Sequence, residues 1–247
     1  MRVAALYDIH GNLPALEAVL DDVREANVDR IVIGGDVVPG PMPHETLTRL
    51  SDLDVPVQYI YGNCEVAVLA QMAGKDPGRM PEQAREAIRW TAEQLHPRYE
   101  PVFASWPKTL RLEVDGLGAV LFCHGTPRDE NEIFTRLTPD ARLRRIFDGV
   151  DASVVVCGHS HMQFDVMVGS VRVVNAGSVG MPFGSTGAYW LLLGPDVQLR
   201  RTSYDLTKAA ERIRKTAYPQ ADEFATRSVL QPPSEAETLE MFARAEK

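Results

Sequence analysis

Residues 2–36 read RVAALYDIHGNLPALEAVLDDVREANVDRIVIGGD, and this stretch indicates the class of fold. The apolar run at 2–7 predicts a buried strand, and the apolar residues between 13 and 23 recur at helical spacing. A second apolar run at 30–35 predicts the next strand. Asn12 is a suitable N-cap for the helix between them. A strand, a helix and a strand in this order favour a parallel sheet, in which ligands bind at the carboxyl ends of the strands.

The same alternation continues along the chain and gives way to a strand-rich later part. A third strand is expected at 55–61, followed by helical sequence at 63–97. Two strands are expected on either side of a turn at 116–118. Another helix is expected at 139–148, and further strands between 152 and 202.

The tail from Leu206 to Lys247 is charged and mainly helical in pattern. Three prolines interrupt it, at positions 219, 232 and 233. We expect the tail to be a solvated helical cap or a partner surface rather than a catalytic part. Since no internal repeat or linker is visible, residues 1–247 are expected to form one domain with a mainly helical C-terminal extension from about residue 206.

The charge, hydrophobicity and cysteine content of the chain limit the kinds of molecule it is expected to bind. A net charge of −8 argues against a protein that binds nucleic acid through a broad basic surface, so an anionic substrate needs a local positive site. No apolar run approaches the roughly 20 residues of a membrane span, and the N-terminus lacks the layout of a signal peptide. The three cysteines, at positions 64, 123 and 157, form no CxxC pair or dense disulfide pattern. We therefore expect a reduced, cytoplasmic setting without membrane contact, and the oligomeric state stays open.

The sequence CGHSH at 157–161 follows the apolar run VVV and places two histidines two residues apart. Side chains at i and i+2 of a strand point to the same side, so His159 and His161 would face one spot if the extended geometry continues. An HxH pair alone is equally compatible with an ordinary polar loop. Its interpretation depends on the other polar residues that follow strands.

Seven such residues follow apolar strands: Asp8, His10, Asp36, Asn63, His124, His159 and His161. Each alone has an ordinary explanation, because an Asp often caps a helix, an Asn beside Gly often makes a turn, and a single His is often on the surface. Together they favour a site, since four of the six histidines of the chain occupy such positions.

Oxygen and imidazole donors without thiolate suit manganese, iron or zinc. Seven candidate ligands exceed what one tetrahedral ion uses, and a carboxylate between two ions can bridge them. We therefore predict two divalent metal ions, with Mn2+ or Fe2+ favoured and Zn2+, Ni2+ or Co2+ as alternatives.

The motifs DxH, GD, GN followed by a variable residue and an acid, an isolated His, and GHxH together resemble the calcineurin-like metallophosphoesterase superfamily over roughly residues 3–178. The resemblance implies an α/β (α+β) fold, a four-layer αββα sandwich of two mixed β-sheets flanked by helices, with a binuclear site at one edge. It also implies the ligand roles: Asp8, His10 and His161 for one ion, Asn63, His124 and His159 for the other, and Asp36 as the bridge.

Two further stretches resemble the small prokaryotic phosphodiesterase branch of that superfamily. They are HGTPRDENE at 124–132 and NAGSVGMPF at 175–183. The second is equally compatible with a glycine-rich turn that lets backbone approach backbone.

The residue after GN departs from the pattern. Many members of the superfamily have a histidine there, considered to help the leaving group depart, whereas this chain has Cys64. A thiol can donate a proton, but a buried structural cysteine is the simpler interpretation. His44, in the loop after Asp36, is a second candidate donor.

The leading functional hypothesis is a metal-dependent phosphodiesterase that hydrolyses a small organic or nucleotide-like diester by metal-activated hydroxide. Asp36, Asn63 and Cys64 are the candidate catalytic residues. Asn63 and Arg128 are the candidate substrate-binding residues, because each can donate hydrogen bonds to phosphoryl oxygens. An ordinary surface ion pair explains Arg128 equally well.

Two alternatives remain at this stage. The same metal core serves phosphomonoesterases, including protein and dinucleoside polyphosphate phosphatases, and a scaffold without catalysis would keep the fold alone. Substrate choice is expected to depend on the loops at 39–45, 72–82 and 125–140, whose conformations the sequence does not specify.

Overall fold

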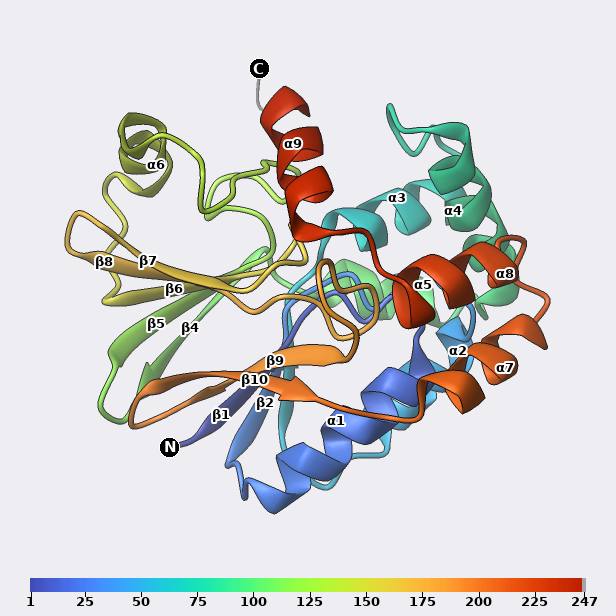
Figure 1. Cartoon of the computed structure of the whole chain (residues 1–247), viewed down its shortest axis with the longest axis horizontal. Coiled ribbons are helices and arrows are strands. Elements are labelled where there is room, and N and C mark those ends of the chain that lie inside the picture. Colours follow the sequence, from blue (N-terminus) through green and yellow to red (C-terminus); the bar gives the residue numbers. More distant parts are fainter. Residues whose placement is uncertain (246–247) are drawn as a thin grey trace.

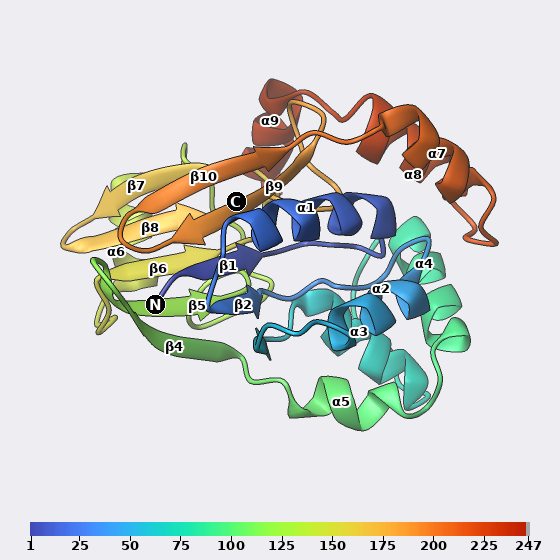
Figure 2. The same cartoon turned by 90° about the horizontal axis from the view of Figure 1, so that it is seen from below.

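Two five-stranded β-sheets pack face to face in the computed structural model, which describes residues 1–245, and helices cover their outer faces (Figures 1 and 2). Both sheets mix parallel and antiparallel pairs. This arrangement confirms the expected sandwich of two mixed sheets flanked by helices.

The first sheet has the strand order β10-β9-β1-β2-β3. Its parallel part consists of β1 (Val3–Leu6), β2 (Arg30–Ile33) and β3 (Val57–Tyr59), as the sequence pattern predicted. Two antiparallel strands, β9 (Ala188–Leu193) and β10 (Val197–Thr202), extend it beyond β1. Strands from both ends of the chain therefore build one sheet.

The second sheet has the order β4-β5-β6-β8-β7. It consists of β4 (Thr109–Val114), β5 (Gly118–Cys123), β6 (Val154–Cys157), β8 (Val171–Asn175) and β7 (Phe164–Val168). The central strands β5, β6 and β8 are parallel, so the loops after β5 and β6 leave the same edge.

Five helices belong to the first half of the chain: α1 (Leu13–Glu25), α2 (Pro43–Ser51), α3 (Asn63–Met72), α4 (Glu82–Gln94) and α5 (Tyr99–Ser105). The side chain of Asn12 accepts a hydrogen bond from the backbone N–H of Ala15 and caps α1, as expected. Helix α5 was not expected, because its seven residues contain Pro101 and are too few to show a helical period. It is held by the burial of Tyr99 and Phe103.

Helix α6 (Asp140–Phe147) covers the outer face of the second sheet. The C-terminal segment then forms α7 (Leu206–Arg214), α8 (Ala221–Phe224), a π-helix (Ala225–Leu230) and α9 (Glu235–Ala245). The described part of the segment after residue 206 is thus mainly helical, and its π-helical turn was not expected. Among the described residues, no helix has the length and apolar character needed to cross a bilayer.

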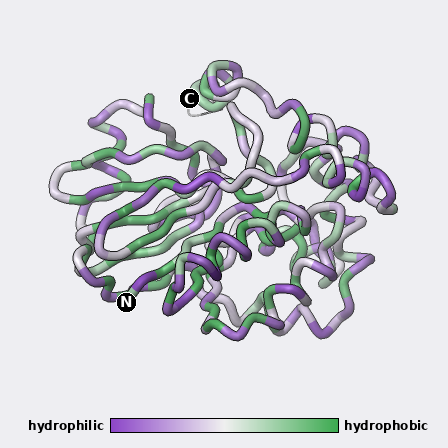
Figure 3. The backbone as a smooth tube through the Cα atoms, turned by 60° about the horizontal axis from the view of Figure 1, so that its bottom comes forward, coloured by the Kyte–Doolittle hydropathy of each residue, from purple (hydrophilic) through white to green (hydrophobic). Residues whose placement is uncertain are grey.

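The alternation of side chains along β1 explains the layers. Val3, Ala5 and Tyr7 face the second sheet, whereas Ala4 and Leu6 face the helices, and all five are fully buried. Apolar sequence accordingly runs through the strands of both sheets (Figure 3). Because both faces of β1 are covered, the polar residues that follow it lie inside the molecule at the sheet edge.

Candidate metal centre

Five loops at the carboxyl ends of strands bring the seven expected residues together. Asp8 and His10 follow β1, Asp36 follows β2, Asn63 begins α3 after β3, His124 follows β5, and His159 and His161 follow β6. This region contains three groups of residues, and within each group the donor atoms lie within 4.8 Å of one another. The groups are Asp8 with His10 and His161, Asp36 with His124 and His159, and His10 with Asp36 and Cys64. The structure thus gathers residues that are up to about 150 positions apart in the chain.

The backbone at these positions is unusual. Asp8, His10, Asp36, His159 and His161 have φ angles between 48° and 65°, in the left-handed region that L-residues rarely adopt. The strands therefore do not continue as extended chain through the motifs. His159 and His161 consequently do not face one spot, as the extended geometry would require, but belong to two different groups.

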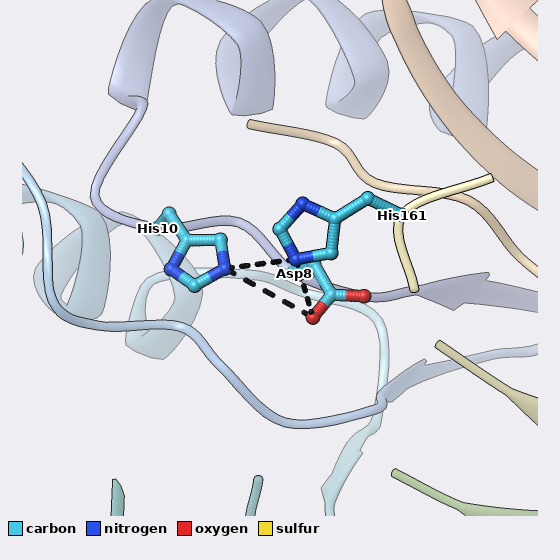
Figure 4. Close-up of side chains that lie close together, drawn as sticks. All are labelled: Asp8, His10 and His161. Carbon is cyan, nitrogen blue, oxygen red and sulfur yellow. Dashed lines mark hydrogen bonds and ion pairs between the residues drawn. The ribbon is translucent and has the colours of Figure 1, made fainter. Parts of the chain in front are cut away.

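The first group is shown in Figure 4. The Nε2 atom of His161 lies 3.4 Å from Oδ1 of Asp8, and the Nε2 atoms of His10 and His161 are 3.3 Å apart. Oδ1 of Asp8 is buried and has no hydrogen-bond partner within residues 1–245. Donor atoms on one metal ion lie about 3 to 4 Å apart when each ligand bond is about 2.0–2.2 Å long. The residues present therefore fit a divalent cation, which would satisfy the unpaired carboxylate oxygen.

The second group adjoins the first through Asp36. Oδ2 of Asp36 lies 3.5 Å from Nε2 of His124 and 3.8 Å from Nε2 of His10. Oδ1 of Asn63 lies 3.0 Å from Nε2 of His124, and the rings of His124 and His159 are 5.1 Å apart. Asp36 thus lies between its own group and His10 of the first group, which fits the bridging position expected from the sequence.

Backbone carbonyls fix the orientation of three imidazole rings. Nδ1 of His124 donates to the carbonyl of Gly34 over 2.9 Å, and Nδ1 of His161 donates to that of Met181 over 2.7 Å. Because a carbonyl only accepts, both rings carry a proton on Nδ1 and turn Nε2 toward the centre. His159 instead donates from Nε2 to the carbonyl of Asn131 over 3.2 Å, which leaves its Nδ1 as the ligand atom.

Glu65, the acid of the GNCE motif, supports the site from behind. Its fully buried carboxylate accepts hydrogen bonds from the backbone N–H groups of Asp36, Val37 and Gly62 over 2.7–2.8 Å. Burial and the negative charge of Asp36 raise the pKa of Glu65 to about 7. In the sequence this acid is visible only as the last residue of a motif, with no signal that indicates its role.

The NAGSVG stretch fastens two of the ligand loops. The side-chain amide of Asn175 donates to the carbonyl of Gly158, and the Ser178 hydroxyl donates to the carbonyl of Asp8. A Cβ atom on Gly180 would lie 1.8 Å from the carbonyl oxygen of Ile9, so this position requires glycine. The close approach of backbone to backbone, one of the two expected interpretations, is confirmed.

Burial and mutual attraction determine the protonation of the site. Burial opposes charge on His124, but the negative charges of Asp36 and Asp8 raise the pKa of His124 to about 10. Burial also opposes charge on Asp36, but His124 and His10 hold the pKa of Asp36 below its usual range. Burial lowers the pKa values of His10 and His159 to about 4. These two rings are therefore neutral at pH 7 and can donate lone pairs to a cation.

The three other expected residues differ in their surroundings. Cys64 is partly buried beside Asn63, and burial together with the charge of Asp36 raises the pKa of its thiol well above the usual value. The Arg128 guanidinium binds the carboxylate of Glu132, with Nε and Oε2 2.7 Å apart, and the carbonyl of Arg145. His44 is exposed on α2 and lies 3.4 Å from the Tyr99 hydroxyl, outside the three donor groups.

Sequence comparison places the chain among known phosphoesterases. Residues 1–194 match the family model of the calcineurin-like phosphoesterase superfamily domain. The chain is 28% identical to the uncharacterized protein MJ0912 of Methanocaldococcus jannaschii, with 88% of this chain and 94% of that protein covered. It is 26% identical to the phosphodiesterase YfcE of Escherichia coli, with 80% of this chain and 89% of the relative covered.

Solved structures have the same architecture. A metallophosphoesterase from Sphaerobacter thermophilus superposes with a TM-score of 0.73 at 25% identity, covering 92% of this chain and 98% of the other. The hypothetical protein PH1004 from Pyrococcus horikoshii gives a TM-score of 0.80 at 20% identity over 94% of this chain and 99% of the other, which supports the fold.

Proposed function

The chain belongs to the calcineurin-like phosphoesterase superfamily, in its small prokaryotic phosphodiesterase branch, and on that premise we propose that it is a metal-dependent phosphodiesterase. The proposed substrate is a small organic or nucleotide-like diester. The observation that carries the proposal is a pair of adjacent donor groups with Asp36 between them, one of which contains the unpaired Oδ1 atom of Asp8.

The donor set supports two divalent ions. Asp8, His10 and His161 would hold one ion, Asn63, His124 and His159 the other, and Asp36 both. Manganese or iron suits these oxygen and imidazole ligands, with zinc, nickel and cobalt as alternatives. When bound, the ions supply Lewis acidity toward the phosphoryl oxygens and activate a water molecule as the nucleophile.

The charges of the site favour a phosphate group. Two carboxylates, Asp8 and Asp36, oppose two divalent cations and leave a formal charge of +2, which attracts an anion although the whole chain is acidic. The side-chain amide of Asn63, whose Nδ2 lies 3.6 Å from Sγ of Cys64, would donate a hydrogen bond to a non-bridging oxygen. Arg128 has no proposed role in substrate binding, because its guanidinium already donates hydrogen bonds to the Glu132 carboxylate and to a backbone carbonyl.

Departure of the alcohol requires a proton. Because burial and Asp36 raise the thiol pKa, Cys64 is protonated at neutral pH and sits next to Asn63. Its thiol is the proposed donor that the structure supports better than His44, whose ring contacts Tyr99 away from the donor groups. The reduced, cytoplasmic setting expected from cysteine usage stays a prediction.

The proposal is tested by assaying purified protein on bis(4-nitrophenyl) phosphate and 4-nitrophenyl phosphate with several divalent cations, together with elemental analysis. We expect faster turnover of the diester and about two metal equivalents per chain. Faster turnover of the monoester would favour the phosphomonoesterase alternative, which uses the same core. A metal-loaded protein that cleaves neither ester, nor any other phosphoester offered, would favour a scaffold.

A further inference from the structure

A cavity of about 390 Å³ opens beside the candidate metal centre. Asn63 and Cys64 line it and belong to the centre as well, and Asn131, which orients His159, lines it too. Its volume is in the range of pockets that hold small organic molecules, about 300–1,000 Å³. The cavity therefore continues the space in which a phosphate would bind.

The walls of this cavity are mainly apolar. Helix α3 contributes Val66 and Ala67, helix α4 contributes Ala84 and Ile88, and the loop between the helices contributes Met80. Val66 is 42% exposed, so part of its apolar surface is accessible in the cavity lining. An apolar group in the cavity would cover it and gain hydrophobic free energy.

Arg79 is the charged residue of the cavity lining. The loop that carries it is held by Arg85, whose guanidinium binds the Asp76 carboxylate over 3.0 Å and the Gly78 carbonyl over 2.8 Å. Asp76 is thereby already paired. Arg79 itself forms no hydrogen bond or ion pair with any other residue in the part of the chain that the structure describes.

We propose that this cavity binds one ester substituent of the substrate, and that the preferred substituent is an apolar or aromatic group that carries a further negative charge. The apolar walls take the hydrocarbon part, and Arg79 pairs with the anionic part, a carboxylate or a second phosphate. The inference rests on the proposed phosphodiesterase function and narrows its substrate class. It gives the loop at 72–82, expected to govern specificity, a defined role.

Three diesters that release the same product test the substituent. They are the 4-nitrophenyl phosphates with methyl, phenyl or 4-carboxyphenyl as the second ester group. In the wild-type protein we expect KM to fall about tenfold from methyl to phenyl and about three- to tenfold again from phenyl to 4-carboxyphenyl. Equal KM values for the three diesters would overturn the proposal.

Substitutions of Arg79 and Val66 test whether the cavity causes these differences in KM. Arg79→Ala should bring the KM ratio of the phenyl and carboxyphenyl diesters to about one, and Arg79→Lys should restore part of it. Val66→Asn should reduce the advantage of phenyl over methyl. The controls are Arg89→Ala, on α4 but outside the cavity, and Val102→Asn, an exposed valine on α5, which should leave both ratios as in the wild type. A carboxylate preference that survives Arg79→Ala would also overturn the proposal.

Binding measurements separate this inference from the proposed function. If the wild-type protein cleaves none of the diesters, the diesterase proposal fails, and calorimetry with phenylphosphonate and 4-carboxyphenylphosphonate then tests the cavity alone. Tighter binding of the carboxylated compound, lost in Arg79→Ala, would support the cavity assignment. Equal affinity for the two phosphonates would refute it.

Discussion

Five side chains of the candidate metal centre sit on backbone in the left-handed region: Asp8, His10, Asp36, His159 and His161. Each such residue costs about 1–2 kcal/mol relative to ordinary backbone. Only one other non-glycine residue among those described, Asn27, has a positive φ angle. Backbone strain of this kind persists where the surrounding structure enforces it. Here the strained residues are those that would hold a cation.

Asp36→Asn should disturb both halves of the centre, because the Asp36 carboxylate lies between His124 of one group and His10 of the other. Asn keeps the shape and tolerates the left-handed backbone, so the fold should persist while the metal content falls and kcat drops at least about a hundredfold. Elemental analysis and steady-state kinetics measure this, with Asp21→Asn on the exposed face of α1 as the control. A metal-loaded Asp36→Asn protein with normal activity would refute the bridging role.

Glu65→Gln tests the support behind the centre. Both carboxylate oxygens of Glu65 accept hydrogen bonds from backbone N–H groups. In the Gln side chain one of these oxygens is replaced by an NH2 group, which cannot accept and would face those N–H groups. We expect a loss of about 1–3 kcal/mol in the free energy of unfolding, measured with urea, and weaker metal retention. Glu45→Gln, on the exposed side of α2, is the matched control. Unchanged stability of the Glu65 variant would contradict the supporting role.

The C-terminal helix is the element that the sequence described least well. It was expected to be a solvated cap or partner surface, and it does lie on the outside of the molecule (Figure 1). Its inner face, however, packs Leu239 and Phe242 with Met162, next to His161. Phe183 stacks on the ring of His161 with centroids 5.2 Å apart and contacts Phe242 at 6.2 Å. Helix α9 therefore reaches the metal centre through two aromatic rings.

Phe242→Ala should loosen this contact. Removing a buried phenyl ring costs up to about 3–5 kcal/mol, and the loss should concentrate in α9 because the helix is terminal. We expect faster proteolysis within α9 and faster loss of metal to a chelator. Met241→Ala is the control, since Met241 is on the same helix and is 52% exposed. Equal proteolysis and metal loss in the two variants would show that the aromatic contact does not support His161.

At the scale of the whole molecule, the candidate metal centre lies where loops of the two sheets meet. The candidate ligands come from loops of both sheets: Asp8, His10, Asp36 and Asn63 from the first, His124, His159 and His161 from the second. A bound cation therefore ties the sheets together at one edge. Anything that binds the folded state and not the unfolded state stabilises it in proportion to the logarithm of its concentration.

Manganese should accordingly raise the melting temperature of the protein. At a free concentration about 100 times the dissociation constant the gain is about 2.7 kcal/mol, or about 5–11 °C for a chain of this length. Calorimetry of chelator-treated protein with and without added manganese measures the shift. The shift should shrink in Asp36→Asn. A melting temperature that is independent of manganese in the wild type would contradict the assignment of the seven ligands.

The residue types, their order and their positions after strands are properties of the chain alone. Local periodicity identified β1, α1 and β2. Polar residues that follow parallel strands gather at the carboxyl edge of their own sheet, so the sequence alone identified Asp8 and Asp36 of the first sheet and His124 of the second as candidates. Other features depend on contacts between distant segments and leave no periodic trace. Among them are the assignment of His159 and His161 to different donor groups, the hydrogen bonds of Glu65, the contact of Phe242 with Phe183 and the cavity that Arg79 lines. The reason is physical: left-handed backbone and packing between the chain ends are fixed by tertiary interactions, which override local preference.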